Sequence, residues 1–67
     1  MKIKVTIYGK ETKEIELKKD KVKIEDLLKE LGFLPVEVVV VKNNEIVPED
    51  DYVCDGDELV IYPIILL

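Results

Sequence analysis

The side chains that usually carry catalysis are scarce in this chain. It has no histidine and no serine, so it lacks the usual general base near neutral pH and the hydroxyl nucleophile of a hydrolase triad. Its one cysteine, Cys54, precedes Asp55, and a neighbouring anion disfavours the reactive thiolate. We therefore expect Cys54 to be structural or incidental rather than reactive, and we expect no enzyme activity, no cofactor and no metal site.

The densest group of charged side chains is acidic and lies in the last third of the chain. Its members are Glu49, Asp50, Asp51, Asp55, Asp57 and Glu58. Their spacing does not match the calcium loop of an EF-hand, and the flanking helices of that motif are missing. Nothing around them predicts a pocket for paired catalytic carboxylates. We interpret the group as a solvated acidic turn, which would also attract a basic partner.

Length and composition limit the classes of protein to which this chain can belong. A chain of 67 residues is predicted to form one domain, residues 1–67. With 48% hydrophobic and 37% charged residues, it can build a core without a disulfide. The prevalence of lysine and glutamate among its charges is typical of proteins stable at high temperature, and equally of designed mini-proteins.

Charge and hydropathy exclude several partners. The net charge of -5 disfavours nucleic acid, whose phosphates repel an acidic surface. No stretch of the sequence approaches the roughly 20 apolar residues of a membrane span, so no membrane association is expected. The single cysteine fits a reducing cytoplasm.

Hydrophobic periodicity predicts the elements of the first half. Residues 1–8 and 13–18 alternate between apolar and polar side chains, which indicates two strands joined by a turn at Gly9. A helix follows. Its apolar stripe has the spacing i, i+3, i+4, i+7 and consists of Ile24, Leu27, Leu28 and Leu31. Gly32 can adopt the left-handed conformation that ends a helix.

The second half is predicted to be three strands. Residues 36–42 contain four successive valines, and apolar side chains on both faces favour an interior strand. After a turn at Asn43 and Asn44, residues 45–47 form a short edge strand, and residues 58–62 form the last strand.

The order ββαβββ predicts an α+β fold of the β-grasp, ubiquitin-like type. One helix packs on one face of a mixed sheet, and the first and last strands lie side by side and parallel in its centre. A single helix leaves the other face open. That face would carry Val60, Tyr62 and one alternate set of valines, either as a protein interface or covered by lysine side chains and the C-terminal tail.

Three motifs resemble one known family. Residues 24–32, IEDLLKELG, are similar to the helix of the ThiS/MoaD family of ubiquitin-like sulfur carriers. Residues 38–48, VVVVKNNEIVP, resemble the hairpin of that family, and residues 55–59, DGDEL, its turn before the last strand. The three motifs occur in the family's order and together span most of the chain.

The resemblance implies a function in thiamine synthesis, molybdopterin synthesis or tRNA thiolation. In that family a ubiquitin-activating-type adenylyltransferase activates a C-terminal Gly-Gly, which then carries sulfur as a thiocarboxylate to an acceptor enzyme. The corresponding positions here are Leu66 and Leu67. The surface expected to bind the partner comprises Val60, Tyr62, Ile64 and Ile65.

The leucines leave a second interpretation open. The chain would then be a β-grasp interaction domain, natural or engineered, without sulfur-carrier activity. In either case the apolar residues 64–67 are expected to pack in part, on the sheet or in a homodimer, because each buried side chain contributes roughly 1.5–3 kcal/mol.

Overall fold

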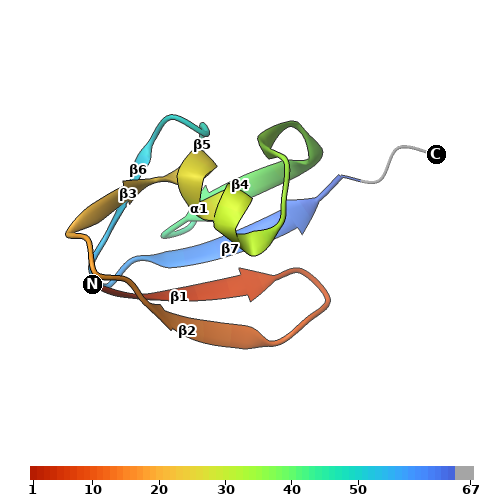
Figure 1. Cartoon of the computed structure of the whole chain (residues 1–67). Helices are drawn as coiled ribbons and strands as arrows, with labels where there is room; N and C mark the ends of the chain where they lie inside the picture. The colour runs from red at the N-terminus through yellow and green to blue at the C-terminus, as the bar shows by residue number, and fades with distance from the viewer. Residues whose placement is uncertain (65–67) are drawn as a thin grey trace.

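The computed structural model describes residues 1–64 as a two-layer α+β structure with helix α1 against one face of a five-stranded sheet (Figure 1). The order of strands in this sheet is β2-β1-β7-β4-β5, and β3 and β6 form a separate two-stranded sheet. The elements are β1 (Lys2–Ile7), β2 (Thr12–Glu16), β3 (Lys21–Lys23), α1 (Ile24–Leu31), the 3-10 helix η1 (Pro35–Glu37), β4 (Val38–Lys42), β5 (Glu45–Val47), β6 (Tyr52–Cys54) and β7 (Glu58–Pro63).

The first and last strands pair in the middle of the main sheet. β1 and β7 pair in parallel, with Val5 opposite Leu59 and Ile7 opposite Ile61. The other pairs, β1 with β2, β4 with β5 and β4 with β7, are antiparallel. The predicted central parallel pair and the predicted β-grasp fold are therefore confirmed.

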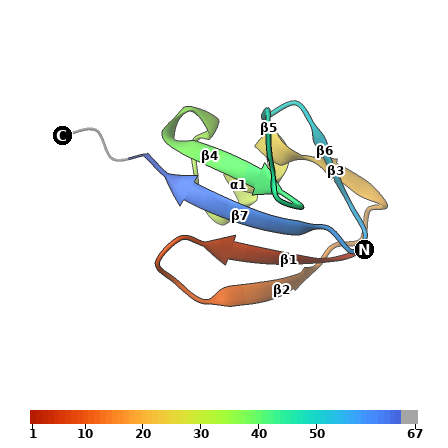
Figure 2. The same cartoon turned by 180° about the vertical axis from the view of Figure 1, so that it is seen from behind.

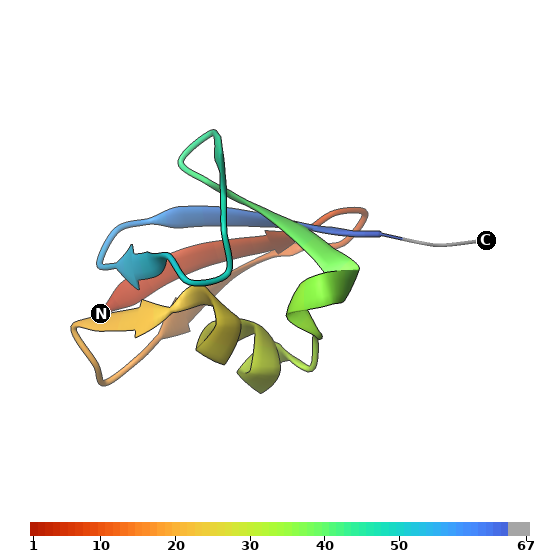
Figure 3. The ribbon, with the colours of Figure 1, turned by 90° about the horizontal axis from the view of Figure 1, so that it is seen from above.

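Figure 3 shows α1 packed against one face of the main sheet, and the buried side chains of the core come from α1 and from the facing strands. Ile24, Leu27 and Leu28 of the predicted helical stripe are buried, and Leu31 is half-buried. They face every second residue of the central strands. The apolar stripe of the helix and the apolar face of the sheet therefore form one buried layer. The buried residues are Ile3, Val5, Ile24, Leu27, Leu28, Val38, Val40, Val53, Leu59 and Ile61.

The valine strand begins two residues later than predicted. Pro35 has the preset φ angle of a helical first position, and η1 closes with a hydrogen bond from the Glu37 N–H to the Leu34 carbonyl oxygen (2.9 Å). β4 therefore starts at Val38, and Val36 is 83% exposed. The prediction of a strand from residue 36 was wrong because the proline turn takes precedence over β-branched composition.

The structure adds two short strands to the predicted order. β3 and β6 pair antiparallel, with Val22 opposite Val53. This ladder brings residues 49–51 to the start of α1, where the N–H groups of Ile24 and Glu25 donate to the carbonyl oxygens of Asp51 and Glu49 (both 2.9 Å). Lys23, at the N-cap, makes no side-chain capping bond, so a distant backbone segment satisfies these helical donors.

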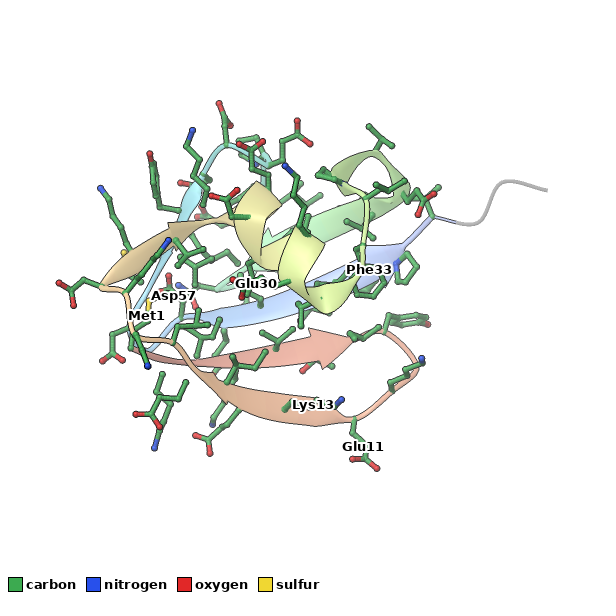
Figure 4. The ribbon with its side chains drawn as sticks, viewed as in Figure 1. Met1, Glu11, Lys13, Glu30, Phe33 and Asp57 are labelled. Carbon is green, nitrogen blue, oxygen red and sulfur yellow. The ribbon has the colours of Figure 1, made fainter. Side chains whose placement is uncertain are left out.

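The end of α1 follows the sequence prediction. Gly32 has φ 88°. Its N–H donates to the carbonyl oxygen of Lys29 (3.1 Å), and the N–H of Phe33 donates to that of Leu28 (2.8 Å). This pair of bonds is the Schellman arrangement, which requires a left-handed residue. Phe33 then packs against the core, near the end of β7 in Figure 4.

Candidate functional site

The face of the main sheet opposite α1 is turned toward the viewer in Figure 2, and no helix among residues 1–64 covers it. The strand register places Val39 opposite Tyr62, and Val41 opposite both Val60 and Ile46. Tyr8 joins them, because its ring lies 5.2 Å from that of Tyr62. We call this group the open-face patch: Tyr8, Val39, Val41, Ile46, Val60 and Tyr62.

The open-face patch agrees in part with the sequence prediction. Val60, Tyr62 and alternate valines lie on the open face as expected. Their role in binding a partner stays a prediction. Sequence reasoning missed Ile46, which is 77% exposed, because its strand is too short for alternation to assign a face. It also missed Tyr8, although the alternation of β1 continued by one residue puts Tyr8 on this face.

The rest of the open face is charged, apart from the hydrogen-bonded pair Thr6 and Thr12. The register places Lys4 between Glu14 of β2 and Glu58 of β7, and Lys2 opposite Glu16. Opposite charges on neighbouring strands are favourable cross-strand pairs. The apolar part of the face therefore lies over β7, β4 and β5 and includes Tyr8 after β1, whereas the charged side chains lie over β1, β2 and the first residue of β7.

The C-terminal segment leaves the sheet beside η1. Pro63 is opposite Val38 in the register, and the N–H of Ile64 donates to the carbonyl oxygen of Glu37 (2.7 Å). The side chain of Ile64 is 46% exposed. Ile65 and the predicted carrier positions Leu66 and Leu67 lie outside the described residues, so the predictions made for them and for tail packing stay predictions.

Three carboxylates of the acidic group, those of Asp51, Asp55 and Asp57, accept hydrogen bonds within the fold. Asp55 Oδ1 accepts from the N–H of Lys2 (2.6 Å). Asp57 accepts from Asn43 Nδ2 (3.1 Å) and from the N–H of Cys54 (2.8 Å). Within residues 1–64, no group of three or more Asp, Glu, Cys or His side chains is arranged to hold a metal ion. These carboxylates therefore fix turns of the backbone.

Asn43 and Asp57 tie the β4–β5 turn to the turn before β7. The N–H of Glu58 donates to Asn43 Oδ1 (3.0 Å), and the N–H of Asn43 donates to the Glu58 carbonyl oxygen (2.9 Å). Figure 4 shows Asp57 at the same end of the molecule as Met1. The turn at Asp57 thus lies away from Ile64.

Cys54 is exposed, lies in β6 opposite Lys21 and precedes the turn that binds the Lys2 N–H. The lone thiol therefore lies at the Met1 end of the sheet, whereas Ile64 follows the opposite end of β7. The structure does not bring Cys54 and the C-terminal segment together.

Among residues 1–64, no helix has both the length and the apolar composition needed to span a membrane.

Among the titratable groups of residues 1–64, Asp51 has a clearly shifted pKa. Its carboxylate accepts from the N–H of Tyr52 (2.8 Å) and from Lys42 Nζ (3.1 Å). First the backbone bond and then the Lys42 bond lower the pKa of Asp51 below its ordinary value of 3.8. A lowered pKa means that the ionised carboxylate stabilises the fold at pH values above 3.8, and that this stabilisation is lost as the pH falls through the lowered value.

We expect Asp51→Asn to melt below the wild type at pH 7, and we expect this difference to disappear at acid pH, as Asp51 of the wild type is protonated. Thermal melting followed by circular dichroism over a pH series measures it. Asp50→Asn is the control, since it removes the same charge from the neighbouring exposed residue. Identical pH profiles for the two variants would contradict a specific contribution of Asp51.

The similarity to known proteins extends over nearly the whole chain and is not limited to one motif. The family described as Small archaeal modifier protein 2 matches residues 1–65. An uncharacterized protein from Archaeoglobus fulgidus is 38% identical over 65 residues, which cover 97% of this chain and 96% of that protein. The family match includes every strand and helix described above and stops before Leu66 and Leu67.

Proposed function

This chain belongs to the small archaeal modifier protein 2 family, and from this we propose that it is a ubiquitin-like sulfur carrier activated at its C-terminal carboxylate. Modifiers of this family work with E1-like activating enzymes. Such an enzyme would join the carboxylate to AMP from ATP and release pyrophosphate. A sulfur donor would then displace AMP, and the resulting thiocarboxylate would deliver its sulfur to an acceptor enzyme of the thiamine, molybdopterin or tRNA-thiolation type.

The observation that carries this proposal is the continuity between the open-face patch and the C-terminal segment. β7 contributes Val60 and Tyr62 to the patch and continues directly into Ile64. An exposed apolar group on so small a domain is a candidate protein interface. A partner that covers the patch would therefore lie next to the segment whose end it modifies. One central strand, β7, would position both the open-face patch and the C-terminal segment.

In this mechanism the chain binds the enzyme and presents its C-terminal carboxylate, and the enzyme carries out the reaction. Tyr62 packs against Tyr8, and the flanking strands hold the β7 backbone on both sides. A segment that starts from a rigid strand leaves the enzyme less of the carrier to order on binding than a free coil would. This role needs no catalytic side chain on the carrier.

The alternative is an interaction domain of the same family without sulfur chemistry. Leu66 and Leu67, where the ThiS/MoaD resemblance implies Gly-Gly, favour it. A channel shaped for glycine would reject two leucine side chains by overpacking.

The two functions differ in the mass of the product. We expect incubation with Mg-ATP and the E1-like enzyme of the same organism to yield the AMP adduct. Addition of a sulfur donor then raises the intact mass by the difference between sulfur and oxygen. Mass spectrometry of the whole protein measures both. Absence of both products, with an enzyme that activates its established carrier, would favour the interaction domain.

A charge in the open-face patch tests the docking part of the proposal. We expect Ile46→Asp to raise the KM of adenylation by about tenfold or more, with little change in kcat, since a buried unpaired charge weakens an apolar interface. Lys18→Gln is the control, because it changes the net charge equally on an exposed residue outside the patch. Equal KM values for both variants would contradict docking through this face.

A further inference from the structure

A second group of exposed apolar side chains surrounds the point where the C-terminal segment leaves the sheet. Val36 is 83% exposed, Leu34 57% and Ile64 46%. Val36 and Leu34 come from the connection between α1 and β4, and Ile64 follows β7. We call these three residues the exit collar. None of them belongs to the open-face patch.

Backbone hydrogen bonds bring the members of the exit collar together. Glu37, the residue after Val36, accepts the hydrogen bond of the Ile64 N–H (2.7 Å). The N–H of Glu37 in turn donates to the carbonyl oxygen of Leu34 (2.9 Å). One residue, Glu37, thus joins the η1 turn to the end of β7.

The connection that carries Leu34 and Val36 is held on both sides by the core. Phe33 packs against the buried cluster before it, and Val38 is buried after it. Pro35 restricts the backbone between them. The exposure of Leu34 and Val36 is therefore built into a restrained turn, which presents two apolar side chains to solvent at a defined place.

Covalent geometry limits how far the C-terminal carboxylate can be from the exit collar. This step rests on the function proposed above, in which the carboxylate of Leu67 is adenylated. Four residues, 64–67, lie between the anchored Ile64 N–H and the carboxylate of Leu67, and an extended residue spans at most about 3.6 Å, so this carboxylate lies within roughly 14 Å of the anchored N–H. An enzyme that encloses this carboxylate with ATP must therefore approach the surface at Glu37 and Ile64.

We infer that Leu34 and Val36 form a second docking element, which is buried against the E1-like activating enzyme around the entrance to the channel that receives the C-terminal segment. The partner surface at this entrance is apolar, because it replaces water around an exposed leucine and an exposed valine. The open-face patch and the exit collar then contact the enzyme on two sides of the β7 terminus.

The test is the variant Val36→Asp, assayed with the E1-like enzyme and Mg-ATP by ATP–pyrophosphate exchange. We expect its KM to rise by about tenfold or more with kcat unchanged, since the side chain contributes to docking and not to chemistry. Because Val36 is exposed, the melting temperature of the Val36→Asp variant should equal that of the wild type. Lys18→Gln again controls for the added negative charge.

Titration calorimetry of the enzyme with each carrier, without ATP, gives a second readout. Weaker binding of Val36→Asp than of Lys18→Gln supports the exit collar even if turnover is slow. If the wild type is adenylated and Ile46→Asp is impaired while Val36→Asp matches the control, the exit collar is refuted and the proposed function stands. If the wild type neither binds nor is adenylated, both are refuted.

Discussion

Replacement of Ile61 by alanine is expected to lower the free energy of unfolding by about 2–5 kcal/mol, the usual cost of removing a buried isoleucine side chain down to Cβ. Ile61 is 0% exposed and lies in β7 between β1 and β4, opposite Ile7 and Val40. Neighbours on both sides are held in strands and cannot collapse freely into the space. The change thus leaves a cavity at the centre of the sheet.

The size of the domain makes this loss large. At roughly 0.05–0.15 kcal/mol per residue, a chain of this length has only about 3–10 kcal/mol of stability. We therefore expect Ile61→Ala to lower the melting temperature by tens of degrees or to unfold the protein at 25 °C. Chemical denaturation followed by circular dichroism measures the difference.

Ile46→Ala is the matched control, because it removes the same atoms from a side chain that is 77% exposed. We expect it to cost at most about 1 kcal/mol, through β-propensity alone. Similar losses at Ile61 and Ile46 would mean that the packing between α1 and the sheet is not the source of stability.

Replacement of both Leu66 and Leu67 by glycine is expected to raise kcat/KM for adenylation by about thirtyfold or more. Overpacking costs typically 1–3 kcal/mol for each side chain that does not fit, and each 1.36 kcal/mol in the barrier is tenfold in rate. Glycine also permits the φ angles and the close backbone approach that a narrow channel demands. Exchange of pyrophosphate into ATP in the presence of the E1-like enzyme measures the gain.

An alanine pair at the same two positions separates side-chain volume from backbone freedom. If volume is the barrier, the alanine variant should recover most of the gain, whereas a need for glycine φ angles would leave it slow. A glycine pair no faster than the wild type would show that the enzyme accommodates the leucines, and the steric argument would be wrong.

The amphipathic patterns allowed most of the core to be predicted. The alternation in residues 58–62 assigned Leu59 and Ile61 to one face and Val60 and Tyr62 to the other, as the structure has them. The helical stripe predicted α1 and its buried face, because a spacing of three and four residues repeats on one side of a helix. Gly32 marked the helix end for an equally local reason.

The departures arose where local preferences compete or where two distant segments meet. Val36 has the composition of a strand residue, but the turn started by Pro35 precedes β4 and leaves Val36 exposed. Val22 and Val53 pair in a sheet of three-residue strands, too short to show alternation. The candidate site was the part least predictable from the sequence. Leu34, Val36 and Ile46 could be assigned to it only from their exposure and their neighbours in the tertiary structure.

The sequence by itself determined most of the buried side chains, where α1 ends, and that one central strand leads into the C-terminal segment with Leu66 and Leu67 at its end. These features depend on periodicity and turn chemistry within a few residues. Only the tertiary structure decided that Glu37 binds the Ile64 N–H, that residues 49–51 accept the first hydrogen bonds of α1, and that Val36 lies exposed beside the exit of β7. Such contacts depend on which backbone groups stay unpaired after the sheet has formed, and no local pattern records that.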